Sequence, residues 1–184
     1  MILPENNHFL NIVLIGMAGA GKSTVGPLVA AGLQYGFIDT DDLIADSRAA
    51  SLQQVLDCLG QKQFRALEEQ TLVAINLDNH VIATGGSAVY ARSGMAHLQD
   101  IALVIWLDAA LPELESRINN PGSRGLVNPD GSSFAELYRQ RFDLYRKYAD
   151  LRIDCTGKGV QEIADEIVEK VRNDGHFGGF PSED

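Results

Sequence analysis

The chain has 184 residues, of which 45% are hydrophobic and 22% are charged, and its formal net charge is −10. This size and composition suit one soluble globular domain, which we expect to span residues 1–174. The acidic surface would repel the phosphates of nucleic acids and of anionic lipids, so neither nucleic acid nor membrane is an expected partner. It would also repel an anionic small-molecule substrate, unless arginine side chains gather in the substrate's site.

The two cysteines, Cys58 and Cys155, lie far apart in the sequence and lack metal-ligand spacing. This usage favours reduced thiols in a cytoplasmic protein. No apolar run is long enough to cross a bilayer, and the first residues do not have the pattern of a secretory signal. We therefore expect a cytoplasmic protein, and a monomer.

Short apolar runs alternate with amphipathic stretches, a pattern typical of a parallel sheet flanked by helices. In chain order we expect a strand over residues 12–15, a helix over 22–33, a strand over 35–39, helices over 43–77, a strand over 80–83, a strand over 101–107, a helix over 111–118, a helix that ends near 148, a strand over 151–154 and a helix over 160–172.

Several positions should interrupt these elements. Pro27 removes a backbone hydrogen bond inside the first helix and should bend it. The helices over 43–77 should break near Ser51 and Gly60. Residues 119–133 (NNPGSRGLVNPDGSS) form a loop that is longer than most connections and typical of a lid. We expect the tail, residues 175–184, to be disordered.

A glycine-rich segment, GMAGAGKS at residues 16–23, matches the phosphate-binding pattern G-x-x-x-x-G-K-[ST] between a predicted strand and a predicted helix. Glycines let backbone N–H groups turn toward phosphates, and the helix N-terminus adds partial positive charge. Lys22 is expected to reach the β- and γ-phosphates of ATP, and the Ser23 hydroxyl to bind Mg²⁺. The predicted nucleotide-binding residues of this loop are Gly16, Ala18, Gly19, Ala20, Gly21, Lys22, Ser23 and Thr24.

Two carboxylates, Asp39 and Asp41, stand at the carboxyl end of the second predicted strand, where open α/β sheets bind their ligands. We expect Asp39 to bind Mg²⁺ through its water shell. Asp41 would take the proton of an attacking hydroxyl or orient that hydroxyl. The alternative is a helix cap, because Thr40, Asp41 and Asp42 also suit a helix start.

The third predicted strand ends in Gly85, Gly86 and Ser87. Glycines here permit close approach of the backbone to a ligand. A plain tight turn is the alternative, but the nearby phosphate loop favours a binding site.

Six segments resemble shikimate kinases in order and spacing: GMAGAGKST, FIDTDDLI, QFRALEEQ, ATGGSAVY, SRGLV and RFDLYRKYAD. The resemblance covers about residues 11–171. It implies the α/β fold of P-loop kinases, with a five-stranded parallel sheet, a helical substrate-binding insert over about 43–77 and a mobile lid over about 119–133. It further implies transfer of phosphate from MgATP to the 3-hydroxyl of shikimate, in aromatic amino-acid biosynthesis.

The resemblance also assigns roles to single residues. Asp41 would contact the shikimate hydroxyls, and Gly85 and Gly86 would supply backbone contacts. Arg124 would be the lid arginine near the transferred phosphate, where it could stabilise the developing charge. Arg117 would lie against adenine, although cations are also common at helix ends for electrostatic reasons alone. The predicted catalytic residues are Lys22, Asp41 and Arg124.

By the same resemblance, Arg65 and Arg141 would bind the carboxylate of shikimate, for which paired guanidinium groups supply charge and geometry. Glu68, three residues after Arg65, would hold that arginine in place. The alternatives are a surface ion pair for Arg65 and Glu68, and a solvated helix face for Arg141.

The chain departs from the family pattern in two places. Ser87 stands where a third glycine is usual, and its side chain could add a hydrogen bond or narrow the pocket. The lid reads Arg124-Gly125-Leu126-Val127 in place of Arg-Pro-Leu-Leu, and glycine for proline raises the ordering cost on closure. These departures leave two alternatives open: a kinase for another small hydroxy acid, such as a gluconate-like one, and a nucleotide-binding homologue without catalysis.

Overall fold

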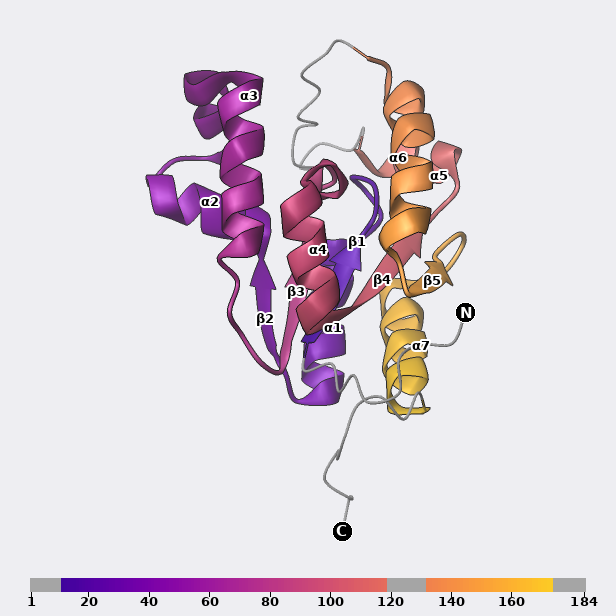
Figure 1. Ribbon diagram of the computed structural model, residues 1–184. Coiled ribbons are helices and arrows are strands. Elements are labelled where there is room, and N and C mark those ends of the chain that lie inside the picture. The colour runs from indigo at the N-terminus through magenta and orange to yellow at the C-terminus, as the bar shows by residue number, and fades with distance from the viewer. Residues whose placement is uncertain (1–10, 119–131, 174–184) are drawn as a thin grey trace.

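The computed structural model describes residues 11–118 and 132–173, and the strands in these ranges form one five-stranded sheet (Figure 1). The strand order is β2-β3-β1-β4-β5, and every neighbouring pair is parallel. The expected parallel α/β sheet is therefore confirmed. The strands are β1 (Asn11–Ile15), β2 (Gly36–Asp39), β3 (His80–Ala83), β4 (Ala102–Asp108) and β5 (Leu151–Asp154).

Helices cover the sheet, and none in the described part of the chain combines the length and apolar character needed to traverse a bilayer. In Figure 1, α2 and α3 lie on the side of β2, whereas α5 and α6 lie on the side of β4 and β5. The helices are α1 (Lys22–Leu33), α2 (Thr40–Arg48), α3 (Leu52–Val73), α4 (Arg92–Ile101), α5 (Leu111–Ile118), α6 (Phe134–Tyr148) and α7 (Val160–Asn173), with a short 3₁₀ turn, η1 (Ala88–Tyr90), before α4.

Most expected elements are present, and the differences have local reasons. The turn η1 and the helix α4 were not predicted from the sequence. Gly94 lowers helix propensity in the first turn of α4, and Ala91 at the N-cap supplies no side-chain cap, so the start of this helix carries little signal in the sequence. The helix α1 runs through Pro27 without a break, whereas Gly60 interrupts α3 with a φ of 69°.

Part of what the sequence predicted falls outside the described residues. This applies to nearly all of the predicted lid, including Arg124 and Gly125, and to the tail. The assignment of residues 1–174 to one domain stays a prediction.

The core follows from the apolar central strands. All residues of β1 and β4 are buried, as expected for parallel strands covered on both faces. A second, small apolar cluster of Ile44, Val55 and Phe64 joins α2 to α3. These two helices therefore have a core of their own beside the main one.

Parallel strands bring the segments that follow them to one edge of the sheet. The glycine-rich loop follows β1, Thr40 and Asp41 follow β2, and Gly85 to Ser87 follow β3. The loop after β5 reaches the same edge. The fold thus gathers the predicted site residues, as the rule for open α/β sheets requires.

Asn11 connects the amino-terminal ends of the central strands, at the edge of the sheet opposite the predicted site residues. Its side chain is buried; Nδ2 donates to the carbonyl oxygens of Leu77, at 2.5 Å, and Ile101, at 3.2 Å. Its Oδ1 accepts a hydrogen bond from the His80 backbone at 3.0 Å. One amide thus joins the start of β1 to the segments that enter β3 and β4.

We predict that Asn11→Ala lowers the free energy of unfolding by about 2–4 kcal/mol, because it leaves buried backbone groups without partners. Urea unfolding measures the loss. The matched control is Gln53→Ala, which removes an exposed amide bonded to Asp57 and should cost less than about 0.5 kcal/mol. Equal losses in the two variants would contradict this role of Asn11.

Candidate active site

A cavity of about 540 Å³ lies at the carboxyl edge of the sheet, within the size range of small-molecule sites. It is lined by the glycine-rich loop, the starts of α2 and α7, the loop after β3, and side chains of α3, α5 and α6. Of the predicted site residues that the structure describes, all line this cavity except Gly16, Asp39 and Arg65. The structure therefore brings most of the predicted site together.

The glycine-rich loop passes tightly between β1 and α1. Gly16 has a φ of 144°, and a Cβ on it would collide with the carbonyl oxygen of Leu107 in β4, so this position requires glycine. Lys22 folds into the loop, and its Nζ donates to the carbonyl oxygens of Gly16, at 2.7 Å, and Met17, at 2.9 Å.

The Lys22 side chain is buried at the cavity wall. Burial lowers its pKa to about 8, although Asp41 and Asp39 act in the opposite direction. An ammonium group held this way is positioned to meet an anionic ligand, whose charge would further favour its protonated form.

Asp39 joins the glycine-rich loop to α2. Its Oδ2 accepts a hydrogen bond from the Ser23 hydroxyl at 2.6 Å, and its Oδ1 accepts one from the Asp41 backbone at 3.0 Å. Asp39 is thus the N-cap of α2. The sequence left open whether the residues at this helix start serve as a cap, and in the structure Asp39 has that role. The two oxygens of Ser23 and Asp39 are hard ligands of the kind that Mg²⁺ prefers.

Asp41 lies between the two ends of the cavity. Its carboxylate packs against Gly85, where a Cβ would come within 2.7 Å of Asp41 Oδ1. Its charge acts on Lys22 at one end and on Glu68 at the other. Gly85 is therefore needed for close approach, and a merely flexible turn does not account for it.

The Ser87 hydroxyl is hydrogen-bonded to a side chain of α3. Its Oγ donates to Glu68 Oε1 at 2.5 Å, so the hydrogen bond that the sequence left open is made with a side chain of α3. Burial raises the pKa of Glu68 to about 7, and the bond from Ser87 opposes that rise. Asp41 raises this pKa as well, and Arg141 and Arg65 lower it. That Glu68 holds Arg65 in place stays a prediction.

The two arginines expected at the acceptor end have different surroundings. Arg141 is only 4% exposed, and its Nε is buried with no hydrogen-bond partner among the described residues. The alternative of a solvated face for Arg141 is therefore wrong. Arg65 is exposed, and its guanidinium lies over the ring of Tyr90.

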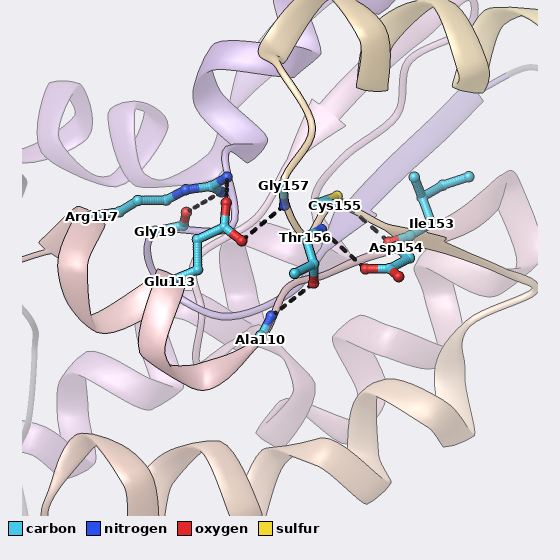
Figure 2. A network of polar contacts seen from close by, with 9 residues as sticks. All are labelled: Gly19, Ala110, Glu113, Arg117, Ile153, Asp154, Cys155, Thr156 and Gly157. Atoms are coloured by element: carbon cyan, nitrogen blue, oxygen red, sulfur yellow. Dashed lines mark hydrogen bonds and ion pairs between the residues drawn. The ribbon is translucent and has the colours of Figure 1, made fainter.

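Arg117 belongs to a polar network that Figure 2 shows. Its guanidinium donates to the Gly19 carbonyl at 3.1 Å and pairs with Glu113 at 2.5 Å. The other oxygen of Glu113 accepts from the Gly157 backbone at 3.1 Å. Glu113 thus links the glycine-rich loop to the loop after β5.

The loop after β5 was not predicted from the sequence as part of the site. Lys158, Gly159 and Val160 line the cavity beside Arg117. They carry no motif, but their place after a parallel strand was a usable signal, since ligands bind at the carboxyl ends of such strands.

The raised pKa of Glu68 has a consequence for stability. Between about pH 4.5 and pH 7, the Glu68 carboxyl is protonated in the folded protein but largely ionised in the unfolded chain. The stability that Glu68 contributes is therefore full below about pH 4.5 and is lost as the pH rises through about 7.

We predict that Glu68→Gln removes this loss. Between about pH 5 and about pH 8, the unfolding free energy of the wild type should fall by about 2–3 kcal/mol relative to the variant, measured by urea unfolding. Glu169→Gln, at an exposed site of α7, is the control and should follow the wild type. A difference between wild type and Glu68→Gln that does not change with pH would contradict the burial effect.

The comparisons with known proteins agree with this geometry. The sequence model of the shikimate kinase family matches residues 18–172. Shikimate kinase of Synechococcus sp. (strain RCC307) is 37% identical over 92% of this chain and 88% of its own length, and that of Geobacter sulfurreducens is 37% identical over 94% and 95%. The structure of shikimate kinase from Acinetobacter baumannii in complex with shikimate superposes with a TM-score of 0.82 at 25% identity, over 91% of this chain and 96% of that one. The chain belongs to the shikimate kinase family.

Proposed function

We propose that this protein transfers the γ-phosphate of ATP to the 3-hydroxyl of shikimate. The observation that carries the proposal is the buried guanidinium of Arg141, in a chain of net charge −10. It lies at the wall of the cavity that the phosphate loop also lines, and its Nε has no hydrogen-bond partner in the part of the chain that the structure describes. A buried cation of this kind calls for an anionic group, and the carboxylate of shikimate supplies one.

At the nucleotide end, the backbone of the glycine-rich loop and the N-terminus of α1 would surround the phosphates. Lys22 would exchange its bonds to Gly16 and Met17 for bonds to the β- and γ-phosphates. Ser23 and Asp39 would hold Mg²⁺, which neutralises charge on the phosphates when it is bound. Arg117, oriented by Glu113, would lie against adenine.

At the reacting atoms, Asp41 would accept the proton of the acceptor hydroxyl while its oxygen attacks the γ-phosphorus. The bond from that oxygen to phosphorus forms, and the bond from phosphorus to the β,γ-bridging oxygen breaks and leaves ADP. Lys22 would stabilise the transferring group, and so would Arg124, which lies outside the described residues.

At the acceptor end, Arg65 and Arg141 would bind the carboxylate, and α2 and α3 would form the wall of the acceptor site. The segment at Gly85 and Gly86 is held in place by two bonds. The Gly85 backbone donates to the Thr40 hydroxyl at 3.3 Å, and the Gly86 carbonyl accepts from the Tyr145 hydroxyl at 2.7 Å. Both bonds fix the backbone that the acceptor would approach. A monomer and a cytoplasmic location stay predictions.

A coupled ADP-release assay with MgATP, run with shikimate and without it, tests the proposal. We expect ADP release that depends on shikimate. Release with a gluconate-like hydroxy acid alone would favour the alternative acceptor. ATP binding without turnover on any acceptor would favour the non-catalytic homologue, and either result would overturn the proposal.

We predict that Asp41→Asn lowers kcat at least about 100-fold, because an amide cannot accept the proton. The Kd for ATP, measured by titration calorimetry, should stay within about twofold. The matched control is Asp42→Asn, an exposed carboxylate in the same helical turn, which should leave kcat unchanged. Normal turnover in Asp41→Asn would remove Asp41 from the chemistry.

A further inference from the structure

One aromatic ring lies against both arginines of the acceptor end. The guanidinium carbon of Arg65 is 5.2 Å from the centroid of the Tyr90 ring, and that of Arg141 is 5.4 Å from the same centroid. Both distances fall within the range of cation–π attraction. The two arginines come from α3 and α6, and Tyr90 ends the turn η1 that follows the Gly85–Ser87 segment.

The position of Tyr90 is fixed by its own turn. The Tyr90 backbone donates to the Ser87 carbonyl at 2.9 Å, and the Ala88 backbone donates to the Gly85 carbonyl at 3.1 Å. The Ser87 hydroxyl is bonded to Glu68 in α3, and the Gly86 carbonyl to Tyr145 in α6. The short segment from Gly85 to Tyr90 therefore connects α3 to α6.

The ring of Tyr90, more than its hydroxyl, makes the relevant contacts. The hydroxyl lies 3.5 Å from Gln140 Oε1, the limit of a hydrogen bond, at an exposed site. The ring faces two cations that repel each other, and its π-electrons attract both. Arg65 is exposed, and contact with the ring restricts its side chain, which reduces the entropy that this side chain must lose on binding an anion.

We propose that Tyr90 is a positioning residue of the acceptor site, whose ring holds the guanidinium groups of Arg65 and Arg141 close together so that both bind one carboxylate. The assignment rests on the proposed function, because it takes the acceptor's carboxylate as the group bound. Tyr90 contributes to binding the acceptor and takes no part in the transfer of phosphate.

The test compares Tyr90→Leu with Tyr90→Phe in the steady-state assay. Leucine removes the ring, and the KM for shikimate should rise about tenfold, while kcat and the KM for ATP stay within about twofold. Phenylalanine keeps the ring, so its KM for shikimate should stay within about twofold of the wild type. Tyr138→Leu is the matched control, because it removes an aromatic ring of α6 that packs on Phe142, and it should leave the KM for shikimate unchanged.

A double-mutant cycle with Arg65→Ala separates positioning from a structural effect. If Tyr90 acts through the arginines, Tyr90→Leu should raise the KM for shikimate less in the Arg65→Ala background than in the wild type. Equal effects in both backgrounds, or a normal KM for shikimate in Tyr90→Leu, would overturn the role assigned to Tyr90. The proposed function would still stand if the wild-type protein turned over shikimate. A wild-type protein that does not turn over shikimate would overturn the proposed function and this assignment with it.

Discussion

The common direction of the five strands is the constraint on which the rest of the structure depends. Because β1, β2, β3 and β5 all point to one edge, four loops that are distant in sequence meet there and enclose a single cavity. Residues that the sequence spreads from the glycine-rich loop to the loop after β5 become neighbours. At the opposite edge of the sheet, the Asn11 side chain stabilises this arrangement by hydrogen bonds to the segments that lead into β3 and β4.

Most buried charged side chains of the described residues lie at the edge of the sheet that carries the cavity. Five charged residues are buried in the described ranges, and all but Asp108 belong to the site or adjoin it: Lys22, Asp39, Glu68 and Arg141. Each buried charge costs stability unless it has a partner. Backbone carbonyls partner Lys22, Ser23 partners Asp39, and Ser87 partners Glu68. Within the described ranges the Nε of Arg141 has no hydrogen-bond partner, and an anionic ligand would supply one.

The sequence was informative wherever one short segment carries both the structure and the chemistry. The phosphate loop, the aspartates after β2 and the glycines after β3 are of this kind, and so the fold and most of the cavity could be predicted. Contacts between distant segments could not. Nothing near Tyr90 in the sequence indicates two arginines at its ring, and nothing near Glu113 indicates Gly157. The burial that raises the pKa of Glu68 is likewise a property of the assembled site.

At Ser87, where the family usually has glycine, a contact with a residue distant in the sequence decides what the substitution does. In the sequence, a serine in place of a glycine suggests either a new bond or a narrower acceptor pocket. In the structure its hydroxyl donates to Glu68, so the added side chain is held by α3 while it lines the cavity. The same short segment carries Tyr90 to the two arginines. Under the proposed function, acceptor recognition would therefore depend on the whole segment from Gly85 to Tyr90, and a substitution within it would act through α3 and α6 as well as through direct contact with the acceptor.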